Sequence, residues 1–374
     1  MKKDLKVAIV CDWLTGIGGA ERVVLELHKL YPKAPIYTSQ YDPKAIDWFV
    51  DADVRTLWLQ HLPKSLKKFL PLLRAIAFSR LDLSSYDLVI SSSGAEAKAV
   101  HTGKNTTHIC YCHAPTHYYW MRYNDYLKHP GFGKLDWLAR IGLKVLVGPL
   151  RKMDYKAAQR PDFLIANSNF TKSQIKKYYG RDCEVIYPPV DIKRFSNLDK
   201  KLVRNGFVVI GRQTPYKKID LAVISATKLN LPLTVIGNGP KHRYLMSIAG
   251  PTVKFITNAS DRDVAKYIVS AEASIFPGID DFGIVAVEAL AAGTPVIAFH
   301  GGGATDYIVE GINGLFFDKQ TADWLSVAMK SFKSAQFDSL KVAKSAEKFD
   351  TSEFRKNMLD LINKKLAEPM KDSI

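Results

Sequence analysis

The chain has little of several features that define whole classes of protein. It carries only four cysteines in 374 residues, which is too few for a disulfide framework and is typical of a reducing compartment. Cys110 and Cys112 alternate along an expected strand, which favours core thiols over metal ligands. Residues 7–10 are too few for the apolar part of a signal peptide, and glycines and Pro295 interrupt the uncharged stretch 289–305. We therefore expect a cytoplasmic protein.

Acidic residues are scarce relative to basic ones. Lys and Arg number 53 against 37 for Asp and Glu, which gives a formal net charge of +16. Such a field attracts nucleotide phosphates, nucleic acid or anionic lipid. Nucleic acid is the weakest of these, because the chain has no recognition motif and its acid-poor segments are scattered.

Short apolar runs alternate with helical patterns along the whole chain. This βα alternation predicts an α/β protein with parallel sheets covered by helices on both faces. The expected strands are residues 7–10, 88–92, 108–112, 163–167, 207–210, 233–236, 253–256, 273–276 and 296–299, and clear helices are 20–30, 219–229 and 264–270.

The length suits two domains of about 100–200 residues each. Pro188 and Pro189, followed by a polar run, indicate a linker. We expect a first domain over residues 1–190, a second over 203–350, and a last helix within 351–374 that crosses back to the first domain.

Glycines lie between the first expected strand and the first helix. Gly18 and Gly19 let the backbone approach a phosphate at a helix N-terminus, although a plain tight turn is the alternative. The dinucleotide fingerprint is excluded, because its third glycine position holds Glu21.

Cations follow the strand that opens the second half of the chain. Arg212 and Lys217 come just after residues 207–210, at the strand end that faces the crevice in open α/β sheets, and they suit a diphosphate. The alternative is two solvated surface cations. Gly237 and Asn238 end the next strand, where a nucleotide base could lie.

A strand, a loop and a helix follow one another over residues 276–288. Free backbone N–H groups near Phe282, Gly283 and Ile284 could hold a phosphate or a sugar hydroxyl. Glu288 lies in an apolar stretch of the helix, so its buried carboxylate needs a partner, and a ribose diol is a candidate. The alternative is helix capping by Asp280 or Asp281.

Two further groups of polar residues are candidate sites, a histidine for sugar contact and a pair of acids for metal binding. His113 follows an expected strand end and could contact a sugar hydroxyl or steady developing charge, although a lone histidine is usually structural. Asp261 and Asp263 resemble a metal-binding pair, but their position predicts helix capping, and we expect no metal site.

Residues 55–80 form a basic segment between Asp53 and Asp82. Apolar residues at helical spacing among its lysines and arginines suit an anionic membrane surface. A core-facing helix with solvated cations is the alternative, and Pro71 would break or kink it. The basic residues are Arg55, Lys64, Lys67, Lys68, Arg74 and Arg80, and the apolar ones are Leu66, Phe69, Leu70, Leu73, Ile76 and Ala77.

These motifs, taken in order, resemble the retaining family 4 glycosyltransferases with the GT-B fold, and within them the mannosyltransferase-like branch of bacterial polysaccharide assembly. The resemblance covers almost the whole chain. It lies in Asp12-Trp13-Leu14, Gly18-Gly19-Ala20-Glu21-Arg22, Tyr111-Cys112-His113-Ala114-Pro115, Ala166-Asn167-Ser168, Tyr178-Tyr179-Gly180, Tyr187-Pro188-Pro189-Val190-Asp191, Gly211-Arg212, Lys217, Gly237-Asn238-Gly239-Pro240 and Asp281-Phe282-Gly283-Ile284 to Glu288.

The resemblance implies two Rossmann-like doubly wound domains facing across a cleft. It implies roles for the matching residues: Arg212 and Lys217 neutralise the leaving diphosphate, and His113 contacts the donor sugar. Gly19 contacts phosphate, Glu288 binds the ribose, and the backbone of residues 282–284 donates to sugar and phosphate. Such enzymes are usually metal-independent and need no cofactor besides the nucleotide sugar.

The chain departs from the family pattern at several positions. Asp280 stands where a glutamate is usual, and its shorter side chain changes its reach to the sugar. Further departures are His117 for an arginine, Met121 for an acid, Thr257 for a glycine and Asp306 for a glutamate.

We expect a retaining sugar transfer, with GDP-mannose as donor, to a glycan or lipid-linked hydroxyl, by a protein that is cytoplasmic or peripheral on the inner face of the membrane. The alternatives are a non-catalytic nucleotide-sugar-binding protein and a GT-B epimerase.

Overall fold

The computed structural model describes residues 5–63, 71–128, 130–131, 133–195 and 204–368. The chain divides into two compact units, one formed by Met1–Pro189 with Ser352–Ile374 and the other by Val190–Thr351.

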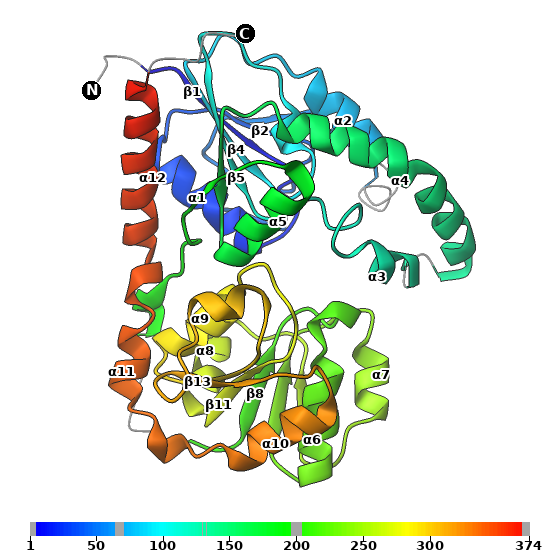
Figure 1. Ribbon diagram of the computed structural model, residues 1–374, viewed down its shortest axis with the longest axis vertical. Coiled ribbons are helices and arrows are strands. Elements are labelled where there is room, and N and C mark those ends of the chain that lie inside the picture. The colour runs from blue at the N-terminus through cyan, green and yellow to red at the C-terminus, as the bar shows by residue number, and fades with distance from the viewer. Residues whose placement is uncertain (1–4, 64–70, 129, 132, 196–203, 369–374) are drawn as a thin grey trace. The chain divides into compact units, whose positions relative to one another are not determined.

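The first unit is built on a seven-stranded parallel sheet in its described part, with strand order β3-β2-β1-β4-β5-β6-β7 (Figure 1). The order reverses between β1 and β4, as in doubly wound folds. The strands are β1 (Val7–Cys11), β2 (Ile36–Thr38), β3 (Val54–Thr56), β4 (Leu88–Ser93), β5 (Thr107–Cys112), β6 (Phe163–Ala166) and β7 (Glu184–Val185).

Helices cover both faces of this sheet because alternate strand residues point to opposite sides. Val7, Ile9 and Cys11 of β1 join a core that includes helices α1 and α12, whereas Ala8 and Val10 join the core on the other face. The helices of this unit are α1 (Gly19–Leu30), α2 (Pro71–Ser79), α3 (Tyr123–Lys128), α4 (Asp136–Ala158), α5 (Asn169–Tyr179) and α12 (Thr351–Ala367).

The last helix, α12, completes the core of the first unit. It buries Phe354, Met358, Leu361 and Ile362 in the same cluster as α1 and β1. Outside the core, the guanidinium of Arg355 donates to the buried carboxylate of Glu26 on α1.

Over its described residues, the second unit is built on a six-stranded parallel sheet with order β10-β9-β8-β11-β12-β13, which reverses between β8 and β11. The strands are β8 (Phe207–Ile210), β9 (Leu233–Ile236), β10 (Val253–Ile256), β11 (Ala273–Phe276), β12 (Val296–Phe299) and β13 (Gly314–Phe317), and the helices are α6 (Ile219–Leu229), α7 (His242–Ser247), α8 (Asp261–Ser270), α9 (Ile284–Ala291), α10 (Ala322–Ser331) and α11 (Ser339–Lys344).

The predicted fold class is confirmed: both units are doubly wound parallel sheets. Sequence analysis missed β2, β3, β7 and β13. The first three are two or three residues long, so no alternation could reveal them. Strand β13 has only three apolar residues, and they follow Gly314, so it resembles a loop in the sequence.

Candidate functional site

The predicted site residues of the second unit lie at the carboxyl ends of its central strands. The strand order reverses between β8 and β11, and ligands of open α/β sheets bind at such a reversal. Arg212 follows β8 directly, is exposed, and makes no ion pair with any described residue. Lys217 ends the short helix η6 (Pro215–Lys217) in the same loop.

Lys217 is paired with a second predicted site residue. Its ammonium donates to the carboxylate of Asp280 from the loop after β11. The two side chains are 22% and 10% exposed, so solvent still reaches the pair. The Asp280 carboxylate is thus directed to Lys217, and the N-cap of α9 is Gly283, so the capping alternative is wrong for Asp280.

The loops after β8 and β9 are held together by backbone contacts. Gly237 has φ 122°, and a Cβ there would lie 2.3 Å from the carbonyl oxygen of Gly211, so the close approach requires glycine. The side chain of Gln213 donates to the Gly237 carbonyl at 2.7 Å, and its backbone N–H donates to the Asn238 carbonyl at 2.9 Å. Asn238 is thus fixed beside the Arg212 loop, with its side chain exposed.

The start of α9 has the shape expected of an anion-binding turn. Gly283 is the N-cap with φ 92°, and as a glycine it has no side chain that could cap the helix. A Cβ at Gly283 would lie 2.4 Å from the Phe276 ring. Phe282 is buried against the ring of Tyr307, whose hydroxyl donates to the Phe282 carbonyl at 2.9 Å. Ile284 begins the helix, half-buried.

Glu288 is buried on α9, as sequence analysis expected, and the structure supplies a protein partner. Arg194, from the short helix η5 (Ile192–Phe195), places Nη2 3.2 Å from Oε1 of Glu288. Arg194 Nη1 also lies 3.6 Å from Asp261. Sequence analysis looked for a ligand hydroxyl as the partner and missed Arg194, because 94 positions separate the two residues.

The acid pair at the start of α8 belongs to its first turn. Ser260 is the N-cap and accepts from the N–H of Asp263, while Asp261 and Asp263 follow it. The prediction that these acids cap the helix is corrected, since the serine does so. Among the described residues no group of three or more His, Cys, Asp or Glu side chains could hold a metal ion.

In the first unit, an internal carboxylate occupies the reversal point. Asp12 follows β1 and accepts from the backbone N–H groups of Gly94, Ala95 and Ala97 at 2.8, 3.0 and 2.7 Å. The loop after β4 is therefore fixed by Asp12, which is itself buried.

His113 lies next to this carboxylate. It follows β5, is half-buried, and its Nε2 lies 2.7 Å from the hydroxyl of Ser92. His113, Asp12, Trp13, Glu21 and five neighbours line a cavity of about 160 Å³. Gly18 is the N-cap of α1 and Gly19 its first residue, one position before the cavity-lining Ala20. The structure thus brings His113 and the start of α1 to the same small cavity.

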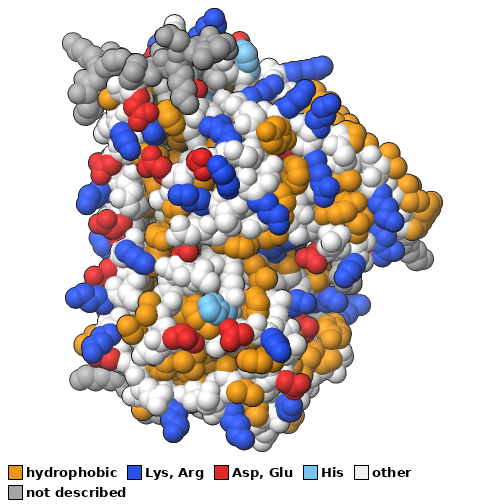
Figure 2. Space-filling model, in the orientation of Figure 1, with side chains coloured by type: hydrophobic (Ala, Val, Ile, Leu, Met, Phe, Trp, Pro, Cys, Tyr) orange, Lys and Arg blue, Asp and Glu red, His pale blue; other side chains and the backbone are white. Residues whose placement is uncertain are grey.

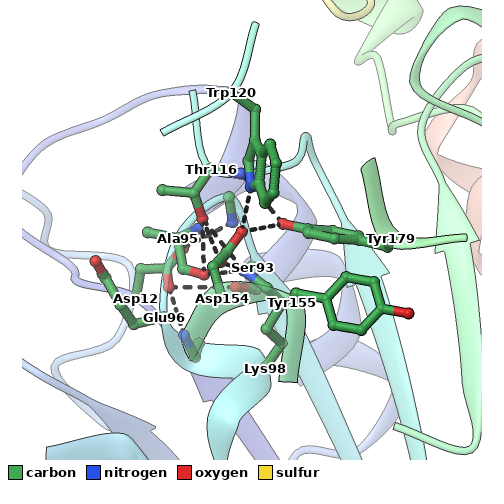
Figure 3. Close-up of polar contacts among 12 residues, drawn as sticks. Asp12, Ser93, Ala95, Glu96, Lys98, Thr116, Trp120, Asp154, Tyr155 and Tyr179 are labelled. Atoms are coloured by element: carbon green, nitrogen blue, oxygen red, sulfur yellow. Dashed lines mark hydrogen bonds and ion pairs between the residues drawn. The ribbon is translucent and has the colours of Figure 1, made fainter. Parts of the chain in front are cut away.

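A buried network anchors the segment that follows His113 (Figure 3). Asp154 on α4 accepts from Thr116 Oγ1, Trp120 Nε1 and Tyr179 Oη at 2.7–2.8 Å, and Lys98 Nζ lies 2.7 Å from it. Burial disfavours the charged form of Lys98, but Asp154 raises the pKa of the ammonium above its ordinary value. Sequence analysis missed both residues, although Asp154 falls on the apolar stripe of Leu150, Ala157 and Ala158.

A second buried ion pair changes the interpretation of segment 55–80. Arg74 on α2 is buried and pairs with Glu96 at 2.9 Å and with the hydroxyl of Tyr118 at 3.1 Å. Sequence analysis counted Arg74 among the cations of a basic surface, and this assignment is wrong because Arg74 is buried. Lys64, Leu66, Lys67, Lys68, Phe69 and Leu70 of that segment lie outside the described residues.

No helix in the described part of the chain combines the length and the apolarity needed to cross a bilayer.

Comparison with known proteins gives two family models that follow one another along the chain. The model described as Glycosyltransferase Family 4 matches residues 17–194, and the model described as Glycosyl transferases group 1 matches residues 191–349. The second match contains Arg212, Lys217, Asp280 and Glu288.

Two curated relatives are similar over different shares of the chain. The α-1,3/1,6-mannosyltransferase Alg2 of Schizosaccharomyces pombe is 24% identical, over 94% of this chain and 78% of its own. The D-inositol 3-phosphate glycosyltransferase of a Nocardioides species is 26% identical, over 57% of this chain and 56% of its own. The chain therefore spans about half the length of that relative.

Two solved structures share the fold. Sucrose-phosphate synthase of Thermosynechococcus elongatus superposes with a TM-score of 0.72 at 16% identity, covering 97% of this chain and 100% of its own. Anabaena HepE in complex with UDP superposes with a TM-score of 0.71 at 16% identity, covering 96% and 100%. With the two family models extending together from residue 17 to residue 349, the chain belongs to the family 4, group 1 glycosyltransferases of the GT-B fold.

Proposed function

We propose that the protein transfers a sugar from a nucleoside diphosphate to an acceptor hydroxyl, with retention at the anomeric carbon. The observation that carries the proposal is the exposed Arg212 beside Lys217 at the strand-order reversal of the second unit. Two cations at such a position suit a diphosphate leaving group. The solved structure of HepE holds UDP, and several relatives are named as glycosyltransferases.

The two cations have different parts in this proposal. Arg212 offers a planar fork for two phosphate oxygens, whereas Lys217 offers a point charge held in place by Asp280. Positive charge supplied by side chains removes the need for a metal ion on the diphosphate, so we propose a metal-independent reaction without a further cofactor.

Glu288 binds the ribose diol in the proposed complex. Its two carboxylate oxygens can accept from the two hydroxyls of the diol, and Arg194 Nη2, 3.2 Å from Oε1, supplies a positive charge beside this buried side chain. The backbone of residues 282–284 donates to the sugar or the phosphate, with Gly283 in the conformation that opens the start of α9.

His113 contacts the donor sugar, with its ring held by the bond to Ser92. Departure of the diphosphate leaves positive charge on the sugar ring, and the leaving phosphate takes the acceptor proton on the same face. This pathway needs no side chain as general base.

GDP-mannose is the proposed donor, from the similarity to the mannosyltransferase Alg2. A lipid-linked or glycan hydroxyl is the proposed acceptor, and the inner face of the cell membrane is the proposed location. The basic surplus of +16 is in keeping with a nucleotide donor and an anionic membrane.

A panel of nucleotide sugars, scored by thermal shift and by donor hydrolysis, tests the proposal. We expect one donor to stabilise the wild type, and the stabilisation to disappear in Glu288→Ala. The matched control is Glu347→Ala, which removes an exposed carboxylate of the same unit and should leave the shift intact.

Three other outcomes would contradict the proposed transfer. No shift with any donor would exclude nucleotide-sugar binding at this site. A shift without transfer to any acceptor would indicate a binding protein, and conversion of the donor sugar without an acceptor would indicate an epimerase.

A further inference from the structure

The first half of α4 carries large apolar side chains on its surface. Trp137, Leu138, Ile141 and Val145 are 59, 52, 52 and 68% exposed. No described residue of α4 before Leu150 is buried. Four large exposed apolar side chains within nine residues are more than scattered surface hydrophobics and mark an interaction site.

These side chains lie on the side of α4 opposite the one that packs against the rest of the first unit. Helical residues advance by about 100° each, which places 137, 138, 141 and 145 within about one quadrant. The buried residues Leu150, Asp154, Ala157 and Ala158 fall on the other side of the same cylinder. The helix is thus anchored by its second half, through the Asp154 network, and presents a different face with its first half (Figure 1).

The charge around this face has one sign. Between Asp136 and Asp154 the helix has no acidic residue and four basic ones, Arg140, Lys144, Arg151 and Lys152. Lys144 and Lys152 are exposed, whereas Arg140 donates to the carbonyls of Leu127 and Lys128 at the end of α3. Figure 2 shows hydrophobic and basic side chains intermixed along the side of the molecule where α4 runs.

Helix α2, which packs against α4, also has exposed apolar side chains. Leu72 and Leu73 of α2 are 38 and 36% exposed, and Arg80 at its end is exposed. The exposed side chains of α4 and α2 thus include aliphatic groups, one tryptophan and cations.

We propose that this α4 face binds the surface of an anionic lipid bilayer. Helices that lie in the membrane interface have apolar side chains on one face and lysines or arginines beside them, and their binding grows with buried apolar area and lipid charge. Tryptophan favours the headgroup level of a bilayer. The proposed lipid binding depends neither on the donor nor on catalysis.

The charge pattern favours lipid over a second copy of the chain. A symmetric dimer through this face would place Lys144 and Lys152 near the same cations of the partner copy, and the helix has no acid between Asp136 and Asp154 to offset them. An anionic lipid surface complements both the apolar and the basic side chains.

Co-sedimentation of the full-length protein with vesicles tests the proposal. We expect binding to phosphatidylcholine vesicles that contain phosphatidylglycerol, weaker binding at high salt, and little binding to phosphatidylcholine alone. Ile141→Asp/Val145→Asp should lower the vesicle partition constant by about tenfold or more. Lys144→Ala and Lys152→Ala should each lower it by roughly fivefold.

The matched control is Val327→Asp, at a position on α10 that is 67% exposed. It should bind vesicles as the wild type does. Since all these positions are exposed, every variant should keep the wild-type thermal midpoint and donor hydrolysis, which separates this proposal from the proposed transfer.

Three results would overturn the proposal. The wild type could fail to bind anionic vesicles, or Ile141→Asp/Val145→Asp could bind them unchanged. A concentration-dependent dimer that Ile141→Asp/Val145→Asp abolishes, without vesicle binding by the wild type, would assign the face to a second copy.

Discussion

Each unit contains a lysine–aspartate pair, and the two pairs differ in how completely the protein satisfies them. Lys98 and Asp154 of the first unit are 0 and 4% exposed, and Asp154 also accepts from three other side chains. Lys217 and Asp280 of the second unit are 22 and 10% exposed, next to the exposed Arg212. The same chemical pair is therefore a structural anchor where every polar atom is occupied, and a candidate ligand contact where solvent still reaches it.

The largest expected effect breaks the buried pair. Asp154→Ala leaves Lys98 charged without a partner and removes the acceptor of Thr116, Trp120 and Tyr179. We expect the free energy of unfolding to fall by about 3–5 kcal/mol, measured by denaturant titration. The double variant Lys98→Met/Asp154→Leu removes both charges and should recover much of the loss. A single variant as stable as the wild type would show that the network is not an anchor.

The second prediction concerns the partly exposed pair of Lys217 and Asp280. Lys217→Ala should lower kcat/KM for sugar transfer by about 10²–10³-fold, because a charge aimed at the leaving diphosphate is lost. Its unfolding free energy should fall by less than that of Asp154→Ala, because the Lys217–Asp280 pair is more exposed to solvent than the Lys98–Asp154 pair. Arg243→Ala, which removes an exposed cation from α7, is the control. Equal losses of stability in Lys217→Ala and Asp154→Ala would erase the distinction between the two pairs.

The third prediction concerns a buried carboxylate whose partner is an arginine. Glu288→Gln keeps the shape of the side chain and should weaken donor binding by about 1.5–3 kcal/mol, seen as a rise in KM or Kd. Glu347→Gln should leave both unchanged. A rise in KM with every nucleotide sugar alike would agree with a contact to the ribose, whereas an effect on one sugar only would argue against it.

The smallest expected effect is a loss of stability at low pH. It tests whether the fold of the first unit requires the neutral form of the buried His108. Burial, with Arg181 and Arg160 nearby, lowers the pKa of His108 to about 3, and its Nε2 lies 2.8 Å from Ser91 Oγ. The neutral ring is favoured in the folded protein, so its contribution is present above pH 6.5 and is lost as the pH falls toward 3. At pH 5 the loss is about 2 kcal/mol.

Comparison with His108→Gln isolates this contribution. The variant cannot gain a proton there, so its thermal midpoint should fall less than that of the wild type between pH 7 and pH 5. Parallel curves for the two proteins would mean that His108 does not titrate in this range.

Sequence reasoning located most strands and the residues at their ends, because strand and loop patterns are local. The strands Phe207–Ile210, Leu233–Ile236 and Ala273–Phe276 have the predicted bounds, and the cations and glycines that follow them were found from position alone. The partners of buried charges could not be found in this way. Arg194 is far in sequence from Glu288, and Lys98 from Asp154, so only the folded chain brings each pair together.

The second unit is inserted in the sequence between two parts of the first unit. Its first residue, Val190, pairs with Asp350 near its end, and the N–H of Val190 donates to the Phe349 carbonyl at 2.9 Å. Residues 190–351 are thus an insertion whose first and last residues lie side by side. The insertion interrupts the first unit, whose core includes α12 from beyond it. The second unit could be excised as one continuous fragment. The core of the first unit becomes complete only after residues 190–351 and α12 have been made, so α12 must emerge from the ribosome before that core can close.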